Sequence, residues 1–408
     1  MRLLLFTGNG GAGTSTIAAA TAVLAARSGI KTLACSLDPA PGRGPSGSLG
    51  ACLGAALEAR PTELEPGLSA VGADPLAQGE QWWQALQGGL PGLLDGLGVD
   101  PVPTRELTVL PGIEELLALQ ALPDHAVDGG FDLVVADCGP AARAIRLLAS
   151  PEAVSRYLEQ ALSVERRVRR ALELGARAGR SAGSAPPRDY LVEAAERLHA
   201  VLAGLRELLD APQTSVRLVL SPDAAGVAQA RQAATALALY GFPVDAVVAN
   251  QLVPGDGDDP WRLARAGDQH AAVEQAERLF APVTVRTVAD ELSEPVGVLA
   301  LLALGEGLYG APGPAAAQTL LGPSERPPAT GEVIRDGEHF ELCQPLPFAD
   351  RRDLGLARSG DHLVLQLGGH RRVLALPSGL RRCVVVGARL AGGVLRVRFA
   401  PDPDLWPQ

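Results

Sequence analysis

A glycine-rich turn near the start of the chain has the residue types and spacing of an anion-binding loop. It follows an apolar run, Leu3 to Phe6, and precedes an alanine-rich stretch, Ile17 to Leu24. Because glycine tolerates positive φ and close approach, successive backbone N–H groups of the turn can converge on phosphate oxygens. The N-terminus of the helix expected after the turn adds a field that favours negative charge. The turn therefore predicts a phosphate site, with the hydroxyls of Ser15 and Thr16 available to phosphate or Mg²⁺.

The turn matches the Walker A pattern G-x-x-x-x-G-K-[ST] at Gly8, Gly13 and Ser15, but Thr14 stands where the pattern has lysine. A lysine contact with bound phosphates is worth about 1.5 to 3 kcal/mol, so its loss lowers affinity about tenfold to a hundredfold. Catalysis loses more, because charge on the transferring phosphoryl group must be neutralised in the transition state. The only lysine in the chain, Lys31, lies at the expected entry to the second strand. We interpret Thr14 as a functional departure from the pattern.

The same turn also fits the dinucleotide-binding pattern G-x-G-x-x-G, through Gly8, Gly10 and Gly13. In that interpretation Asp38, which follows an expected strand at Thr32 to Leu37, binds a ribose hydroxyl. A third interpretation is a glycine-rich connection between a strand and a helix that binds nothing. The turn alone leaves all three open.

The elements that must hold this turn alternate between apolar strand-like runs and helical segments. Further strands are expected at Phe131 to Ala136, Val216 to Leu220, Val244 to Ala249 and Val283 to Val288. Strands that alternate with helices form a parallel sheet, whose ligands bind at the carboxyl ends of the strands. Asp137 follows one of these runs, at the position of a Walker B carboxylate that holds Mg²⁺ or its water. The predicted fold class is α/β, a mostly parallel P-loop NTPase-type sheet flanked by helices, with a helical subdomain and a small C-terminal all-β sandwich.

The chain divides into a large domain, 1–310, a linker, 311–331, and a small domain, 332–401. Within the large domain, segments of about 51–122 and 151–210 have helical patterns and are expected to form the helical subdomain. The linker is rich in proline, alanine and glycine. Beyond it, short alternating segments separated by glycine turns predict the all-β sandwich.

Composition and charge argue against several classes of protein. A hydrophobic content of 47% with 20% charged residues is typical of a globular chain, and the formal net charge of −10 argues against nucleic acid as a partner. We expect no transmembrane segment, because no apolar run is long enough to span a bilayer. The five cysteines are scattered and lack a C-x-x-C pair, so we expect reduced thiols in a cytoplasmic protein.

Several motifs together resemble the ArsA and guided-entry family of deviant Walker A ATPases, over essentially the full length of the chain. Asp38-Pro39-Ala40 is similar to the family's switch I, and Asp137-Cys138-Gly139-Pro140 with Arg146-Leu147-Leu148 is similar to its switch II. Asn250-Gln251-Leu252-Val253-Pro254 resembles the segment that contacts adenine. The residues around Pro345 to Asp350 are similar to the α-crystallin-like domain appended to some members.

The resemblance implies Mg-ATP or ADP as the cofactor, with Asp38 positioning the attacking water and Ser15 and Asp137 holding Mg²⁺. The alternative that the site binds no cofactor also remains. The nucleotide-binding residues that the resemblance implies are Gly8, Asn9, Gly10, Gly11, Ala12, Gly13, Thr14, Ser15, Thr16, Asn250 and Gln251.

Departures from the family pattern weaken the expected enzymatic activity. Both signature lysines of the family loop are replaced, by Asn9 and Thr14, and Pro41-Gly42 stands in place of the His-Ser that follows switch I. Members that capture tail-anchored membrane proteins resemble one another in a methionine-rich groove, whereas the only methionine here is Met1.

The leading hypothesis is a degenerate family member with a weakened or empty nucleotide site, acting as a dimeric scaffold or chaperone-like protein. It forms a homodimer or a heterodimer with an intact paralogue, and a hydrophobic or amphipathic client would bind an apolar groove from Leu158 to Leu205. The first alternative is a slow Mg-ATP hydrolase in which Arg43, Arg143 or Arg146 replaces the missing lysine. The second is a binder of a dinucleotide or another anion at the glycine turn.

Overall fold

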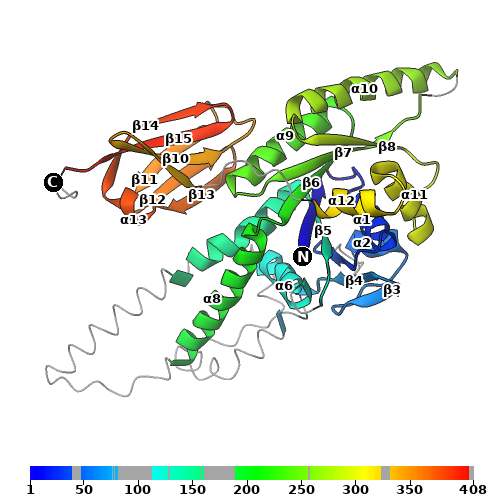
Figure 1. Cartoon of the computed structure of the whole chain (residues 1–408), viewed down its shortest axis with the longest axis horizontal. Helices are drawn as coiled ribbons and strands as arrows, with labels where there is room; N and C mark the ends of the chain where they lie inside the picture. The colour runs from blue at the N-terminus through cyan, green and yellow to red at the C-terminus, as the bar shows by residue number, and fades with distance from the viewer. Residues whose placement is uncertain are drawn as a thin grey trace, which may run out of the picture.

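The computed structural model describes residues 1–38, 47–75, 77, 79–80, 113–126, 129–156, 158–159, 189–255, 258–322 and 331–403. These residues form a large α/β domain and a smaller β domain that lie side by side (Figure 1). Much of the predicted helical subdomain, together with Arg43, lies outside the described residues.

An eight-stranded sheet organises the large domain, in the order β3-β4-β2-β5-β1-β6-β7-β8. All neighbouring strands are parallel except β3 and β4. The predicted α/β class with a mostly parallel sheet is therefore confirmed. The strands are β1 (Arg2–Gly8), β2 (Thr32–Ser36), β3 (Thr62–Glu65), β4 (Leu68–Gly72), β5 (Leu133–Pro140), β6 (Thr214–Leu220), β7 (Val244–Leu252) and β8 (Thr284–Ala289).

Helices cover both faces of this sheet. Strand β1 is therefore buried on both sides, which explains why its sequence is continuously apolar. Leu3 and Leu5 point into one core cluster, whereas Leu4 and Phe6 point into the cluster on the other face. One face packs against α1 (Thr14–Arg27), α2 (Gly47–Leu53), α11 (Val298–Tyr309) and α12 (Pro314–Leu321). The other packs against α6 (Ile113–Ala126), a helix at 141–156, α8 (Asp189–Asp210), α9 (Ala224–Leu239) and α10 (Pro260–Phe280). In the part of the chain that the structure describes, no helix has the length and apolarity needed to cross a membrane.

Two segments differ from the sequence-based expectation. Part of the predicted helical subdomain forms β3 and β4 instead, and β4 adds the buried side chains of Leu68, Ala70 and Val71 to the core of the sheet. The first half of the predicted linker forms α12, whose Ala316 and Leu320 are buried. The prolines that favoured a linker there are compatible with a helix, because a proline in the first turn loses no intrahelical hydrogen bond.

The smaller domain consists of two antiparallel sheets, ordered β14-β15-β10-β9 and β11-β12-β13. Alternate side chains such as Leu363, Leu365, Val397 and Phe399 are buried in its own core cluster. This confirms the predicted small β domain. Its elements are β9 (Glu332–Asp336), β10 (His339–Pro345), β11 (Leu354–Ser359), β12 (His362–Leu367), β13 (His370–Ala375), α13 (Ser378–Arg381), β14 (Cys383–Ala391) and β15 (Val394–Pro401).

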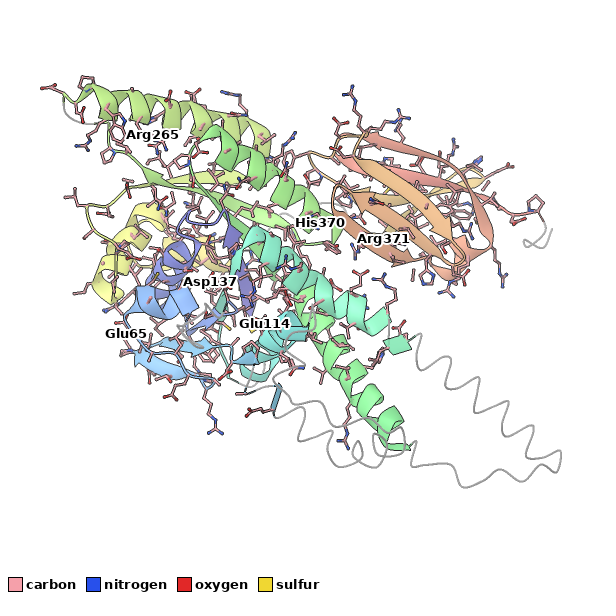
Figure 2. All side chains as sticks on the ribbon, turned by 180° about the vertical axis from the view of Figure 1, so that it is seen from behind. Glu65, Glu114, Asp137, Arg265, His370 and Arg371 are labelled. Atoms are coloured by element: carbon pink, nitrogen blue, oxygen red, sulfur yellow. The ribbon has the colours of Figure 1, made fainter. Side chains whose placement is uncertain are left out.

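The sandwich docks on the large domain through α9 and the helix at 141–156. Arg372 Nη2 lies 3.1 Å from Glu152 Oε2, on the second of these helices. His370, on the side of the sandwich that faces the large domain (Figure 2), makes an edge contact with Tyr240, with 6.4 Å between ring centroids. The sandwich therefore packs against the large domain of its own chain in a defined position.

Candidate nucleotide-binding site

The glycine turn connects β1 to α1 in the conformation that an anion-binding loop needs. Gly11 and Gly13 have φ angles of 82° and 81°, and Gly13 caps the N-terminus of α1. The turn is fixed at its start by Asn9, whose N–H donates to Val219 O at 3.1 Å. Helix α1 then begins at Thr14, so its unpaired N–H groups face the concave side of the turn.

Two of the glycines are required because neighbouring atoms leave no room for a side chain. A Cβ on Gly8 would lie 2.0 Å from Val219 O, and one on Gly13 would lie 2.4 Å from Asn250 Nδ2. That amide nitrogen donates to Ala12 O at 2.9 Å, so Asn250 braces the loop from behind. In this structure Asn250 is thus a positioning residue for the loop, a role that the sequence motif alone did not indicate.

A cavity of about 530 Å³ lies in front of the loop, and most of the predicted site residues line it. Of that set, Gly8 and Ala12 are buried behind the loop, and Asp137 is buried beneath it. The predicted residues that line the cavity are Asn9, Gly10, Gly11, Gly13, Thr14, Ser15, Thr16, Asp38, Asn250 and Gln251.

Sequence reasoning missed a further wall of the cavity, formed by the loop at 289–295 after β8 and by α2 residues Ser48, Ala51 and Cys52. The loop follows the carboxyl end of a parallel strand, and this position is the signal that could have identified it. Its Asp290, Glu291 and Glu294 all line the cavity.

Asp137 lies in the interior of the large domain (Figure 2), with 1% of its surface exposed. Burial raises the pKa of this carboxyl to about 6, against the lowering effects of the Ser15 hydroxyl and the Gly139 N–H. Its Oδ1 accepts a hydrogen bond from Gly139 N at 3.1 Å, whereas its buried Oδ2 has no hydrogen-bond partner in the part of the chain that the structure describes. A buried carboxylate oxygen without a partner next to a serine hydroxyl fits a site for Mg²⁺ or its water.

The described charged side chains that line the cavity are all negative. Among the described residues that line it, four are acidic and none is lysine or arginine. Arg143, one of the predicted substitutes for the lysine, forms an ion pair with Asp38 and lies 3.3 Å from Glu114 Oε1. Arg146 points to Glu115, with 3.5 Å between Nε and Oε1. Both arginines are therefore engaged by carboxylates rather than directed at the loop.

The two residues that replace the signature lysines also point elsewhere. Asn9 Nδ2 donates to Gly226 O at 3.3 Å, which ties the loop to the start of α9. Thr14 is 8% exposed, with its hydroxyl directed toward Gly8. Neither position supplies a cation to the cavity.

The predicted client groove is only partly described. At one of its ends, Leu205 is fully buried in the core beneath the sheet, so it does not line an exposed groove. Residues 160–188, which make up more than half of the segment from Leu158 to Leu205, lie outside the described residues.

Comparison with known proteins agrees with the geometry of the loop. The family model described as "Anion-transporting ATPase" matches residues 1–310, and the model described as "HSP20-like domain found in ArsA" matches residues 337–399. A protein of Streptomyces coelicolor is 40% identical over 100% of both chains. A protein of Mycobacterium tuberculosis is 36% identical over 100% of this chain and 97% of its own. A Chlorobaculum tepidum protein named "Putative arsenical pump-driving ATPase" is 30% identical over 93% of this chain and 91% of its own.

Proposed function

Because the chain belongs to the anion-transporting ATPase (ArsA) family, we propose that it is an ATPase-like member whose nucleotide site is folded but weak, and that it acts as a dimeric scaffold or chaperone-like protein. In this proposal the loop keeps the shape of a P-loop but binds a triphosphate weakly and does not hydrolyse it efficiently. Its five cysteines are all buried and form no disulfide, which suits a cytoplasmic protein.

The charge around the cavity is the observation that carries this proposal. A nucleoside triphosphate is strongly anionic, and here it would face Asp38, Asp290, Glu291 and Glu294 with no cationic side chain among the described lining residues. Charges within a cavity of this size lie inside the screening length of about 8 Å at physiological ionic strength, so their repulsion persists in solution. The backbone N–H groups of the loop offset only part of it.

The residues present suit Mg²⁺ better than they suit the triphosphate. Ser15 and Asp137 are the residues that would hold Mg²⁺, which would neutralise part of the phosphate charge when bound. Asp137 Oδ2 is available for this role because it has no partner among the described residues. We therefore expect residual, magnesium-dependent nucleotide affinity rather than none.

Exposed apolar side chains next to the cavity support the dimeric part of the proposal. Leu292, Val296 and Leu299 are 109%, 51% and 79% exposed; Leu292 lies in the acidic loop after β8, and the other two follow it. Exposed apolar side chains close together in one segment are typical of a protein contact site. A second copy of the chain, or a related chain with intact lysines, is the occupant we propose for it.

A second candidate function, slow Mg-ATP hydrolysis, is favoured by one observation. Arg143 is bonded to Asp38, which lines the cavity, so its guanidinium is held beside the site although it is not directed at the loop. If the Asp38–Arg143 pair opened, Arg143 would be the cation for the phosphates.

The experiment that tests the proposal restores the missing charge. Thr14→Lys should raise the affinity for Mg-ADP, measured by calorimetric titration, by about tenfold to a hundredfold. Gln275→Lys, which adds the same charge at an exposed position of α10, is the matched control and should leave the affinity unchanged. Equal affinities for the native protein and Thr14→Lys would mean that another cation already serves the loop, and the second candidate would then replace the first.

A further inference from the structure

A second large cavity, of about 850 Å³, lies between the large domain and the sandwich. It borders the starts of β7 and β8, the ends of α9 and α10, helix α12 and the turn between β14 and β15. These strand starts form the amino edge of the sheet, opposite the edge that carries the glycine loop. The cavity is therefore separate from the candidate nucleotide site.

Much of the lining of this cavity is apolar. Three phenylalanine rings and four prolines contribute to it, and Phe280 and Phe348 meet there with 5.3 Å between their ring centroids. A volume in this range and a largely apolar lining are typical of sites for small molecules with an apolar body. The apolar lining residues include Phe242, Phe280, Pro282, Pro345, Pro347 and Phe348.

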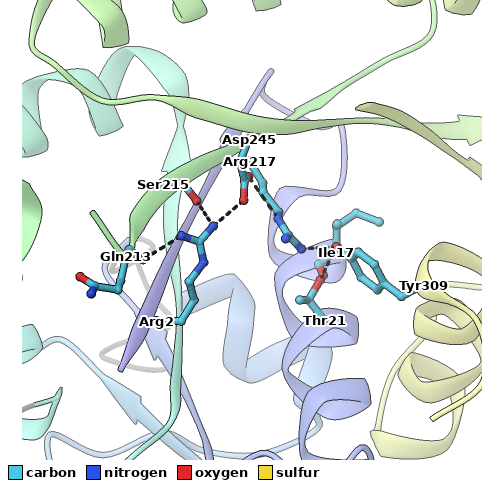
Figure 3. Close-up of polar contacts among 8 residues, drawn as sticks. All are labelled: Arg2, Ile17, Thr21, Gln213, Ser215, Arg217, Asp245 and Tyr309. Atoms are coloured by element: carbon cyan, nitrogen blue, oxygen red, sulfur yellow. Dashed lines mark hydrogen bonds and ion pairs between the residues drawn. The ribbon is translucent and has the colours of Figure 1, made fainter. Parts of the chain in front are cut away.

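The remaining lining includes Arg217, Asp245 and Arg286. These residues belong to a cluster of charged side chains on strands of the sheet (Figure 3). Asp245 accepts from Arg2 Nη2 at 2.8 Å and from Arg217 Nε at 3.3 Å. Arg217 Nη1 also donates to the hydroxyl of Tyr309 at 2.9 Å. Figure 3 shows the guanidinium groups of Arg2 and Arg217 on either side of the Asp245 carboxylate.

Arg286 adds a third cation to this cluster. Its guanidinium carbon lies 5.0 Å from the centroid of the Tyr309 ring, and that of Arg217 lies 5.4 Å from the same centroid. Burial lowers the pKa of Arg2 and of Arg286, and the nearby Arg217 lowers both further. Among the described residues, Asp245 is the carboxylate that raises the pKa of each of the three arginines.

Three positive charges thus face one negative charge in a mostly buried place, and the cluster is short of acceptors. Each guanidinium has five N–H donors. Among the described residues, Arg286 donates only to Leu308 O at 2.8 Å, and the buried Nε of Arg2 has no partner. Buried charges in proteins are normally paired, so the excess of positive charge favours binding of a further anion.

We propose that this cavity binds an amphipathic anion, with the carboxylate or phosphate head held by Arg286 and Arg217 and the apolar body packed against the rings of Phe280 and Phe348. The head supplies the negative charge and the acceptors that the arginine cluster lacks. The body fills the apolar part of the lining, which spans the large domain and the sandwich. Occupancy of this site would consequently strengthen the contact between the two domains.

Titration calorimetry with single-chain amphiphiles, used below their micelle concentrations, tests the proposal. We expect saturable binding of dodecanoate or dodecyl phosphate, and whichever binds more tightly identifies the head. Dodecyltrimethylammonium, which has the same chain and the opposite charge, should not bind, and inorganic phosphate should bind much more weakly because it lacks the chain.

Two variants and a control complete the test. Arg286→Gln should weaken binding about tenfold to a hundredfold, because it removes a charge-assisted contact. Thr284→Trp, an exposed strand residue that lines the cavity, should block the site without touching the arginines. Arg278→Gln removes the same charge from an arginine that is 70% exposed on α10, and it should leave binding unchanged.

Three results would overturn the proposal: no saturable binding of either anion, equal binding of the cationic amphiphile, or full binding by Thr284→Trp. Thermal unfolding of each variant verifies that it is folded before titration. If Arg286→Gln fails to fold, Thr284→Trp decides the question alone.

Discussion

The ion pair between Asp38 and Arg143 should couple switch I to the helix at 141–156, and its strength can be measured. Arg143 is shared by Asp38 and Glu114, the latter at 3.3 Å. Replacing Arg143 by glutamine leaves two carboxylates without their cation. Replacing Asp38 by asparagine leaves Arg143 with Glu114. We therefore predict that Arg143→Gln destabilises the protein more than Asp38→Asn does.

The exposure of the two side chains sets the magnitude. Arg143 and Asp38 are 16% and 23% exposed, so the pair lies between a surface pair and a fully buried one. Surface pairs contribute about 0.2 to 1 kcal/mol, whereas removing one partner of a buried pair costs about 3 to 5 kcal/mol. We expect a loss of about 2 kcal/mol in the free energy of unfolding for Arg143→Gln, about 1 kcal/mol for Asp38→Asn, and a coupling energy of about 1 kcal/mol.

Urea unfolding of the native protein, the two single variants and the double variant measures this coupling as a double-mutant cycle. Glu115→Gln is a suitable control, because it removes a carboxylate paired with the exposed Arg146 on the same pair of helices. Single-variant losses that simply add, or a larger loss for Asp38→Asn than for Arg143→Gln, would refute the reasoning.

Three further predictions concern other parts of the molecule. Because burial raises the pKa of Asp137 to about 6 from 3.8, the fold loses stability as pH rises from about 3.8 to about 6, and the full loss persists at higher pH. Without Mg²⁺, Asp137→Asn should therefore be more stable than the native protein by up to about 3 kcal/mol at about pH 8 in urea unfolding, with no difference near pH 4. Gly13→Ala should displace the Asn250 side chain and lower the free energy of unfolding by about 1 to 3 kcal/mol, whereas Asn250→Ala combined with it should restore part of the loss. Phe348→Ala removes the ring contact with Phe280 and should speed hydrogen exchange at the end of α10, whereas Phe348→Leu should have a smaller effect.

The fold was predictable where burial on both faces leaves a continuous apolar run. Strand β1 reads as such a run because Leu3 and Leu4 enter opposite core clusters. Strand β3 is largely exposed and carries Glu63 and Glu65, so nothing in its sequence distinguishes it from a loop or a polar helix turn. Its place in the sheet comes from pairing with β4, a tertiary contact that a local pattern does not contain.

The candidate site was predictable to the extent that local rules determine it. The rule that ligands bind at the carboxyl ends of parallel strands placed Asp38, Asp137 and Asn250 around the glycine turn. What those side chains contact could not be read from the sequence. Asn250 braces the loop, and Asp38 is paired with Arg143, 105 residues away in the chain. Such pairings depend on how separate helices pack. The acidic loop after β8 differs in this respect, because its position at the carboxyl end of a parallel strand could have identified it.

Calorimetric titration of the native protein with Mg-ATP, at about physiological salt, tests the central proposal most directly. We predict no saturable heat below about 1 mM nucleotide, because the described lining of the cavity holds four carboxylates and no cation. Micromolar binding with one nucleotide per chain would contradict this, and it would mean that Arg143 or a residue of a partner chain supplies the charge that Thr14 lacks.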